Sequence, residues 1–377
     1  MVPGCFTQEL LKELHSNIYN SYTDNYDIDS LGPLQTTIRQ RISRQVKGFL
    51  LKRKLLPRND VATLFSAIQP FVWFFHRFEV LYDSLADVES RYLLVQVVAF
   101  RVLGHEKVRL PLNNVHFWKQ RDVLRNLMDT GDTFVAGHYR MCLFDLYHIG
   151  YAVKLYSPPT GPQPTFLLKQ YEYRSKAVHI KAEQGDVVID AGGCWGDTAL
   201  YFAYEVGETG QVYSVEFINS NLKIMEKNLQ LNNALRKRIK IVERPLWSKP
   251  DVALYFKDRG PSSRGALEVA NGDEESVRHT TTTIDAMVEQ NQLSKVDFIK
   301  MDVESAEPEA LRGAERTIRQ FRPKLAISVY HSVSDFVDVF EFVSSLNLGY
   351  KFYLGHYTMH WHETVLFAVS DAVSREF

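Results

Sequence analysis

A glycine-rich turn between a buried strand and a helix constrains this chain more than any other feature. A short apolar run ends in the carboxylate of Asp190, and Gly192, Gly193 and Gly196 follow before a helical pattern begins at Thr198. Glycine is needed where a chain turns sharply and where a ligand must touch the backbone. The new helix offers unpaired N–H groups and the positive end of its dipole. The turn therefore predicts a ligand at the carboxyl edge of a parallel sheet.

Beyond the turn, short apolar runs alternate with helical patterns, which indicates βαβ units and a parallel sheet. The last two predicted strands have no helix between them, so they should pair antiparallel. The expected fold is an α/β doubly wound sheet closed by a C-terminal antiparallel hairpin. The predicted strands cover residues 187–190, 212–216, 239–242, 252–256, 297–302, 324–330, 351–354 and 364–369, and the predicted helices cover 198–206, 221–231, 284–290, 307–320 and 336–346.

The first part of the chain has a different pattern. It is mostly helical up to about residue 130, with a helix expected at 84–100. Residues 157–164 hold four prolines and a glycine, which predicts a stiff, exposed connection. We therefore divide the chain into a mostly helical N-terminal region, residues 1–170, and an α/β domain, residues 171–377. We expect the N-terminal region to cover the mouth of the site, to contribute to substrate selection and to offer a surface for homo-oligomer formation.

Residues 39–58 carry eight basic residues and no acidic one, and apolar residues recur on one helical face. One interpretation is a basic amphipathic helix that faces an anionic surface, substrate or partner. The other, which we prefer because such faces are common on soluble helices, is a surface helix packed on its apolar side.

Composition excludes several classes of function. Lysine and arginine total 44 against 45 acidic residues, a net charge of −1, so nothing indicates a nucleic-acid partner. Cys5, Cys142 and Cys194 are too widely spaced to indicate a disulfide scaffold or a zinc cluster, and a reducing cytoplasm is the expected compartment. No apolar stretch is long enough to span a bilayer, and residues 1–9 show no signal-peptide pattern.

Two cofactors could use the glycine turn. A dinucleotide needs G-x-G-x-x-G, and here Ala191 stands at the first glycine position. S-adenosylmethionine has no phosphate, and a carboxylate at Asp190 suits its ammonium and sulfonium charges. Glu216 ends the next strand and can accept the hydroxyls of a ribose, which fits either cofactor.

A second acidic constellation follows the strand at 297–302. Asp302 ends that strand, Glu304 follows two residues later, and Glu307 is a typical acid at a helix start. Because the carboxyl ends of parallel strands meet at one edge, we expect Asp302 near Asp190 and Glu216. Asp302 and Glu304 could take a proton from a hydroxyl or favour a sulfonium. His331 ends the next strand and is a candidate base, since the unperturbed pKa of a histidine lies near neutrality.

The loop between the last two strands holds His356, His360, His362 and Glu363. A His–x–His pair beside an acid could bind a metal. We favour a polar and aromatic substrate loop instead, because no sequential motif fixes the ligand geometry, and we predict no metal site.

Four stretches resemble a known family: VVIDAGGCWGDTAL, VEFINSNLKIMEKNLQLNN, VDFIKMDVESAEPEALRGAE with RPKLAISVYH, and HETVLFA. Residues 187–368 are similar to FkbM-type S-adenosylmethionine-dependent methyltransferases. The resemblance implies a class I methyltransferase (Rossmann-like) fold and methyl transfer, usually to an oxygen of a sugar, polysaccharide or natural product. The chain departs from the family pattern at Cys194, where members usually have Asn, and at Ser305, where they usually have Gly.

The resemblance and the positions of side chains at the strand ends and in the hairpin loop together indicate roles for individual residues. The expected acceptor is a small-molecule or carbohydrate hydroxyl, with Glu304 or His331 removing its proton and Asp302 ordering the site. The expected cofactor contacts are Asp190, Gly192, Gly193, Gly196, Asp197, Thr198, Glu216, Phe217, Trp247 and Asp302, and the expected substrate contacts are Tyr330, His331, His356, Tyr357 and Glu363.

The sequence thus predicts an S-adenosylmethionine-dependent O-methyltransferase. Two alternatives stay open: a nicotinamide-dependent oxidoreductase, and a non-catalytic binding protein with the methyltransferase fold. Binding of S-adenosylhomocysteine alone, of NAD alone or of neither would separate the three.

Overall fold

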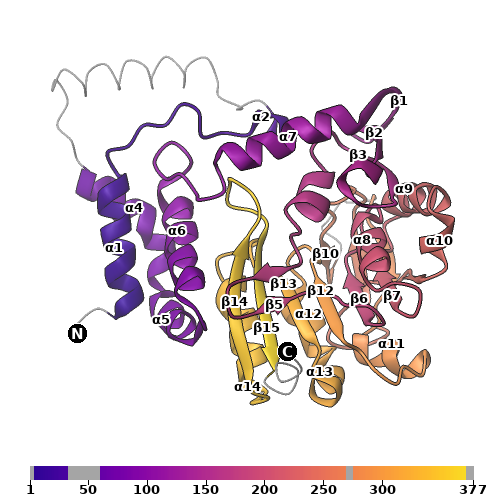
Figure 1. The fold of residues 1–377 in the computed structure, drawn as a ribbon. Helices are drawn as coiled ribbons and strands as arrows, with labels where there is room; N and C mark the ends of the chain where they lie inside the picture. Colours follow the sequence, from indigo (N-terminus) through magenta and orange to yellow (C-terminus); the bar gives the residue numbers. More distant parts are fainter. Residues whose placement is uncertain (1–3, 33–59, 269–274, 371–377) are drawn as a thin grey trace.

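A computed structural model describes residues 4–32, 60–268 and 275–370 of the chain (Figure 1). Its centre is a seven-stranded sheet in the order β14-β15-β13-β12-β6-β7-β8. Strands β6, β7, β8, β12 and β13 run parallel, and β15 pairs antiparallel with both β13 and β14. The strands are β6 (Val187–Ala191), β7 (Gln211–Val215), β8 (Ile239–Val242), β12 (Phe298–Met301), β13 (Lys324–Ser328), β14 (Tyr350–His356) and β15 (Thr364–Ser370).

Helices cover both faces of this sheet, because its central strands are apolar on both sides. Val188 packs into a cluster with α8 and α9, whereas Ile189 and Ala191 pack into a second cluster with α11 to α14. This alternation follows the two-residue period of a strand. The helices are α8 (Asp197–Glu205), α9 (Asn219–Gln230), α10 (Asn233–Arg236), α11 (Ile284–Gln290), α12 (Glu307–Arg312), α13 (Glu315–Phe321) and α14 (Asp335–Ser345).

The single helix predicted over 307–320 is two helices, α12 and α13. They are separated at Gly313, where a Cβ atom would lie 2.1 Å from the carbonyl oxygen of Trp247. The carbonyl of Gly313 accepts the N–H of Asp285 at 3.0 Å. The break therefore comes from a neighbouring loop that packs against the backbone, which periodicity along the chain does not reveal.

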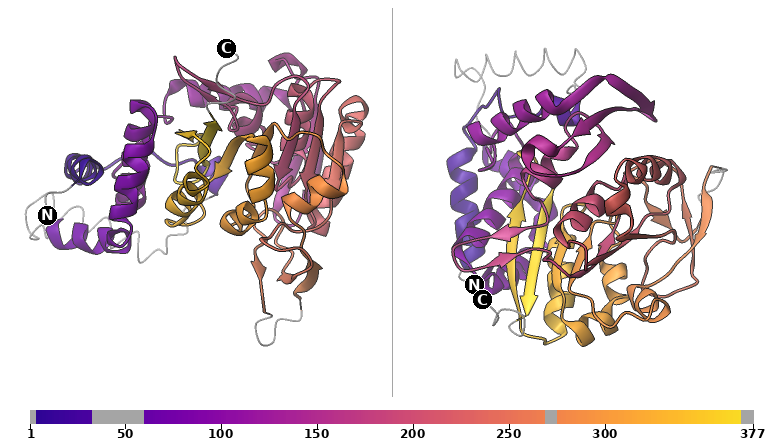
Figure 2. Two further views of the ribbon diagram at one scale, coloured as in Figure 1. Left: turned by 90° about the horizontal axis from the view of Figure 1, so that it is seen from below. Right: turned by 45° about the vertical axis from the view of Figure 1, so that its right-hand side comes forward.

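A small antiparallel sheet projects from the main sheet, as Figure 2 shows. It has the order β10-β9-β11 and consists of β9 (Ala253–Phe256), β10 (Gly265–Ala266) and β11 (Val277–Thr280). Its inner residues border the cavity described below.

The N-terminal helices pack beside the C-terminal hairpin, at the β14 edge of the sheet (Figure 1). The N–H of Ala86 donates to the carbonyl of Phe352 at 2.8 Å, and Phe6, Leu94 and Phe352 belong to the same apolar cluster. These helices are α1 (Cys5–Asn17), α4 (Asp60–Val72), α5 (Phe75–Ser84) and α6 (Val88–Leu103). Helices α2 (Ile28–Leu31) and α7 (Val115–Leu127) lie apart from this group, and α7 contacts η2 (Gln163–Leu167) (Figure 1).

The helix predicted at 84–100 begins later, at Val88. Asp87 caps it by accepting the backbone N–H of Ser90 at 2.8 Å, and Leu85 is extended. The capping carboxylate, rather than the apolar spacing, decides where this helix starts.

The description of residues 1–170 as mostly helical is incomplete. An antiparallel sheet follows α7, in the order β1-β2-β3, with β1 (Met128–Ala136), β2 (Tyr139–Asp145) and β3 (Lys154–Ser157). The turn η1 (Tyr147–Ile149) lies between β2 and β3. The short elements η2 (Gln163–Leu167), β4 (Tyr173–Arg174) and β5 (His179–Ile180) then connect this sheet to the main sheet.

The proline-rich segment is not simply an exposed connection, so that prediction is wrong. The π-helical turn η2 begins within it, with Gln163 and Phe166 buried, and the side chain of Gln163 donates to the carbonyl of Phe117 at 3.0 Å. The basic segment 39–58 lies outside the described residues. No helix in the described part of the chain has both the length and the apolar character needed to cross a bilayer.

Candidate active site

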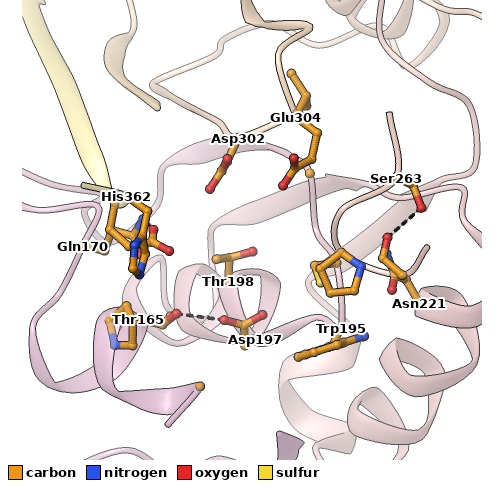
Figure 3. Close-up of a pocket in the computed structure, with 18 of the residues that line it drawn as sticks. Thr165, Gln170, Trp195, Asp197, Thr198, Asn221, Ser263, Asp302, Glu304 and His362 are labelled. Atoms are coloured by element: carbon orange, nitrogen blue, oxygen red, sulfur yellow. Dashed lines mark hydrogen bonds between the residues drawn. The ribbon is translucent and has the colours of Figure 1, made fainter. Parts of the chain in front are cut away.

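A cavity of about 690 Å³ opens at the carboxyl ends of β6, β7, β8, β12 and β13 (Figure 3). Its volume lies within the range usual for small-molecule sites. Residues from the glycine turn, the β7 end, the β12 end, the hairpin loop and the segment before residue 172 line it together.

The glycine turn brings the backbone close to the neighbouring strand end. Gly192 has a φ of 88°, and a Cβ atom there would lie 1.9 Å from the carbonyl oxygen of Asp302. A Cβ atom on Gly193 would lie 2.2 Å from Oγ of Ser214, and Gly196 has a φ of 83°. Only glycine fits at Gly192, and α8 then starts at Asp197 with its N-terminus toward the cavity.

Asp190 does not line the cavity, so the prediction of a direct cofactor contact is not met. It is fully buried and accepts hydrogen bonds from Thr198 Oγ1 at 3.0 Å and from Ser214 Oγ at 2.7 Å. Its third partner is Nζ of Lys300, at 3.1 Å. Asp190 therefore stabilises the glycine turn through buried hydrogen bonds and does not face the cavity.

Lys300 is a site residue that sequence reasoning missed. It lies on β12, is 1% exposed, and donates to the carbonyl oxygen of Gly192 at 2.6 Å. Burial alone would lower the pKa of Lys300, but the carboxylates of Asp190 and Asp302 raise it, so the ammonium stays charged. A lysine within the otherwise apolar strand β12 could have indicated this role, because a buried charge needs a partner of opposite charge.

Glu216 lies at the β7 end and is part of the cavity wall. Its Oε1 accepts the backbone N–H groups of Phe217 and Ile218, both at 2.7 Å, and its Oε2 accepts Nδ2 of Asn221 at 3.1 Å. Burial raises the pKa of Glu216. Phe217 and Trp247 lie in the same part of the cavity and belong to one small apolar cluster.

The start of α8 is tied to the segment before the main sheet. Thr165 Oγ1 donates to Asp197 at 2.8 Å, as Figure 3 shows. Burial raises the pKa of Asp197. Thr198 also lines the cavity, so the structure places both predicted residues, Asp197 and Thr198, in the cavity wall.

Asp302 and Glu304 enter the cavity from the β12 end (Figure 3). Asp302 accepts the hydroxyl of Tyr171 at 3.1 Å and that of Tyr330 at 3.2 Å. The side chain of Glu304 is 26% exposed and lies 3.6 Å from Nε of Arg264. The structure therefore brings both predicted acids and Tyr330 together.

His331 lies among three carboxylates. Its Nε2 is 3.3 Å from Asp302 and 3.7 Å from Glu304, and its Nδ1 is 3.2 Å from Glu307. Burial alone would lower the pKa of His331, but Glu304 and Glu307 raise it to about 11. The expectation of a pKa near neutrality is wrong, and His331 is cationic at neutral pH. Glu307 accepts the N–H of Val303 at 2.8 Å, as an acid at a helix start does.

The hairpin loop supplies Tyr357, His362 and Glu363 to the cavity, but not His356. His356 is buried, its Nδ1 is 2.9 Å from Oγ1 of Thr364, and burial lowers its pKa to about 3. The prediction that His356 contacts substrate is therefore wrong. Burial, with the nearby charge of Asp302, raises the pKa of Glu363 to about 8, and Nε2 of Gln170 donates to this carboxylate.

Residues 179–352 match the family model described as the methyltransferase FkbM domain. These residues form an FkbM-type methyltransferase domain. No curated protein matches the chain.

A solved structure with a similar fold carries the FkbM name. Methyltransferase FkbM from Methylobacillus flagellatus KT aligns over 80% of this chain with a TM-score of 0.50 and 19% identity. The chain spans 60% of the length of that protein. At this identity the likeness is one of fold. The alignment to a putative rRNA-methylase from Clostridium thermocellum has a TM-score of 0.33, 13% identity and coverage of 50% of this chain and 88% of that one. The alignment to fibrillarin from Aeropyrum pernix, in complex with natively bound S-adenosyl-L-methionine, has a TM-score of 0.33 and 12% identity. It covers 63% of this chain and 98% of that one.

Residues outside the matched FkbM range complete the cavity. Thr165, Gln170 and Tyr171 precede it, and Glu363 follows it, yet all four line the cavity. Sequence reasoning missed the first three, because each acts through a carboxylate that is distant in sequence: Asp197, Glu363 and Asp302 respectively.

Proposed function

We propose that this chain is an S-adenosylmethionine-dependent O-methyltransferase that acts on a hydroxyl of a sugar, polysaccharide or natural product. One observation carries the proposal: a single cavity joins the glycine turn and Glu216 to the acids Asp302 and Glu304. The glycine turn and Glu216 suit a nucleoside with a cationic amino-acid end. Asp302 and Glu304 suit a hydroxyl acceptor beside it.

The wall of the cavity fits the proposed cofactor. The backbone of Gly192 is open to a ligand, Glu216 can accept ribose hydroxyls, and Phe217 and Trp247 offer an apolar surface for adenine. The carboxylates of Asp197 and Asp302 favour the positive charges of the amino-acid end. When bound, S-adenosylmethionine supplies an electrophilic methyl group.

Glu304 is the proposed proton acceptor. It lines the cavity, whereas the neighbouring His331 is cationic and cannot accept a proton at neutral pH. Asp302, held by the hydroxyls of Tyr171 and Tyr330, orients the acceptor. Orienting the two reactants supplies a further large part of the rate.

Aromatic side chains favour a saccharide as the acceptor. A second cavity of about 580 Å³ shares Glu304 and Tyr330 with the first. The side chain of Trp361 borders it, is 46% exposed, and has its ring 6.4 Å from that of Tyr330. Such rings present an apolar face against which the C–H groups of a sugar can pack.

Two measurements test the proposal. Calorimetry should show binding of S-adenosylhomocysteine and no binding of NAD; the reverse would favour an oxidoreductase, and binding of neither would favour a non-catalytic protein. A screen of hydroxylated saccharides then identifies the acceptor by release of S-adenosylhomocysteine.

With that acceptor, Glu304→Gln should lower turnover by about 10²–10⁴-fold at unchanged affinity for S-adenosylhomocysteine. The matched control is Glu309→Gln, because Glu309 pairs with Arg312 on the neighbouring helix α12 outside both cavities. Equal turnover in the two variants would remove Glu304 as the base.

A further inference from the structure

Asp302, Glu307 and His331 form a cluster that the proposed methyl transfer does not fully use. One ligand atom from each residue lies within 4.8 Å of the others. Glu307 is fully buried, and the side chain of His331 is 3% exposed. With Glu304 beside them, three carboxylates surround one imidazole, which leaves an excess of negative charge in a poorly hydrated place.

Several polar atoms of this cluster are unsatisfied. Neither ring nitrogen of His331 has a hydrogen-bond partner among the described residues, and neither has Oε2 of Glu307. A buried polar atom without a partner costs about 1–3 kcal/mol, more if charged. A ligand bound by one ring nitrogen of His331 together with the carboxylates would satisfy part of this cluster.

The spacing of these atoms suits ligands of one cation better than hydrogen-bonded partners. Nε2 of His331 lies 3.3 Å from Asp302 and Nδ1 lies 3.2 Å from Glu307, yet neither contact is aligned as a hydrogen bond. Adjacent donors around an octahedral cation bound at about 2.1 Å lie about 3 Å apart. The two ring nitrogens of His331 point in different directions, so only one of them can face the cation. The carboxylates of Asp302 and Glu307 supply the other ligand atoms, and one ligand atom from each residue lies within 4.8 Å of the others.

We propose that Asp302, Glu307 and His331 bind a divalent cation of the Mg²⁺ or Mn²⁺ class beside the acceptor. Carboxylate oxygens favour these hard cations, and Mn²⁺ also accepts an imidazole nitrogen. The cation would take the place of the proton on His331. Asp302 lines the larger cavity and His331 the smaller one, so the cation would be within reach of an entering hydroxyl.

The role that we propose for the cation in catalysis rests on the proposed methyltransferase function. A bound divalent cation lowers the pKa of a coordinated hydroxyl. The O–H bond then breaks with its proton passing to Glu304, the new O–CH₃ bond forms, and the S–CH₃ bond breaks to leave S-adenosylhomocysteine. No oxidant or reductant enters.

Electron paramagnetic resonance of Mn²⁺ titrated into the metal-free full chain tests the site directly. We expect one Mn²⁺ per chain, displaced by Mg²⁺, and at least tenfold weaker binding in Glu307→Gln and in His331→Ala. Glu309→Gln, on the same helix as Glu307, should bind as the unaltered protein does. Absence of Mn²⁺ binding at millimolar concentration, or unchanged binding in both cluster variants, overturns the site.

Further readouts separate the cation from the methyltransferase proposal. Thermal unfolding of each variant shows whether it folds. If the substitution of the buried Glu307 by Gln prevents folding, His331→Ala still tests the site. Binding of S-adenosylhomocysteine without Mn²⁺ removes the cation site and leaves the methyltransferase. Binding of Mn²⁺ without S-adenosylhomocysteine supports the site and removes the proposed function. If the metal-free protein keeps full turnover in the presence of a chelator, the cation has no role in the reaction.

Discussion

Three residues other than glycine hold left-handed backbone at the two turns that frame the site. Cys194 has a φ of 44°, Glu304 of 54° and Ser305 of 76°. Two of these, Cys194 and Ser305, are the positions where the chain departs from the pattern it resembles. Left-handed backbone costs a residue with a Cβ atom roughly 1–2 kcal/mol. The chain therefore holds both turns against local strain.

Ser305→Gly should relieve that strain. We expect the free energy of unfolding to rise by about 1 kcal/mol in chemical denaturation, because glycine adopts φ 76° without a steric penalty. Ser305→Ala is the matched control, since it removes the hydroxyl but keeps the Cβ atom. A gain in the alanine variant equal to that in the glycine variant would assign the effect to the hydroxyl instead.

Gly192→Ala should cost more than the same change at Gly104. The two glycines have φ values of 88° and 81°, but a Cβ atom meets a carbonyl oxygen at Gly192 and nothing within 4 Å at Gly104. Gly104→Ala should therefore lose only about 1–2 kcal/mol of stability and keep affinity for S-adenosylhomocysteine. Gly192→Ala should lose more stability and that affinity. Equal behaviour of the two variants, in denaturation and calorimetry, would contradict the close approach.

Between elements, the buried pair Asp190–Lys300 links β6 to β12. Lys300→Met should destabilise the protein by roughly 3–5 kcal/mol, because it leaves a buried carboxylate without its cation. The double variant Asp190→Asn with Lys300→Met should lose less than the sum of the two single changes. Additive losses in chemical denaturation would show that the two charges do not interact.

Most strands of the main sheet were predictable because they are buried on both faces and their patterns are strong. Strand β8 and helix α11 have the predicted bounds. The β1-β2-β3 sheet was missed because the side chains of β1 are almost all partly or fully exposed, so no alternation of apolar and polar residues marks it.

The location of the candidate site was predictable from the sequence, but the contacts between its side chains were not. The sequence places Gly192, Glu216, Asp302 and Glu304 at one sheet edge, and they line one cavity. Whether a carboxylate faces the cavity or an internal partner depends on a residue far along the chain. Asp190 faces Lys300, 110 positions later, and the sequence alone does not supply that pairing.

At the scale of the whole molecule, the buried side chain of His360 ties the N-terminal region to the hairpin loop. The N–H of Asp27 donates to Nε2 of His360 at 3.2 Å, and the carboxylate of Asp27 pairs with Arg121 in a buried contact. Burial lowers the pKa of His360 and of His362 to about 4. These imidazoles are neutral in the folded protein, and protonation at low pH works against the contact.

His356→Gln tests this dependence away from the cavity. A folded pKa of about 3 lies below the ordinary value of about 6.5, so His356 stabilises the fold above pH 6.5 and less as the pH falls toward 3. The difference in unfolding free energy between the unaltered protein and His356→Gln should shrink by at most about 1.4 kcal/mol for each pH unit below 6.5. Parallel stability profiles of the two proteins from pH 7.5 to 4 would contradict the assignment.

Strand β15 lies between β13 and β14, although it is the last of the described strands along the chain. Its residues Val365–Ala368 pair with β13, so this edge of the sheet stays open until that segment has left the ribosome. At roughly 5–20 residues per second, the preceding α/β units have seconds in which to form first. During that interval the edge of β13 lacks its neighbouring strand, and His362 and Glu363 are not yet held in the site. Ligand binding by nascent chains should therefore begin abruptly, only once residues 364–370 have emerged.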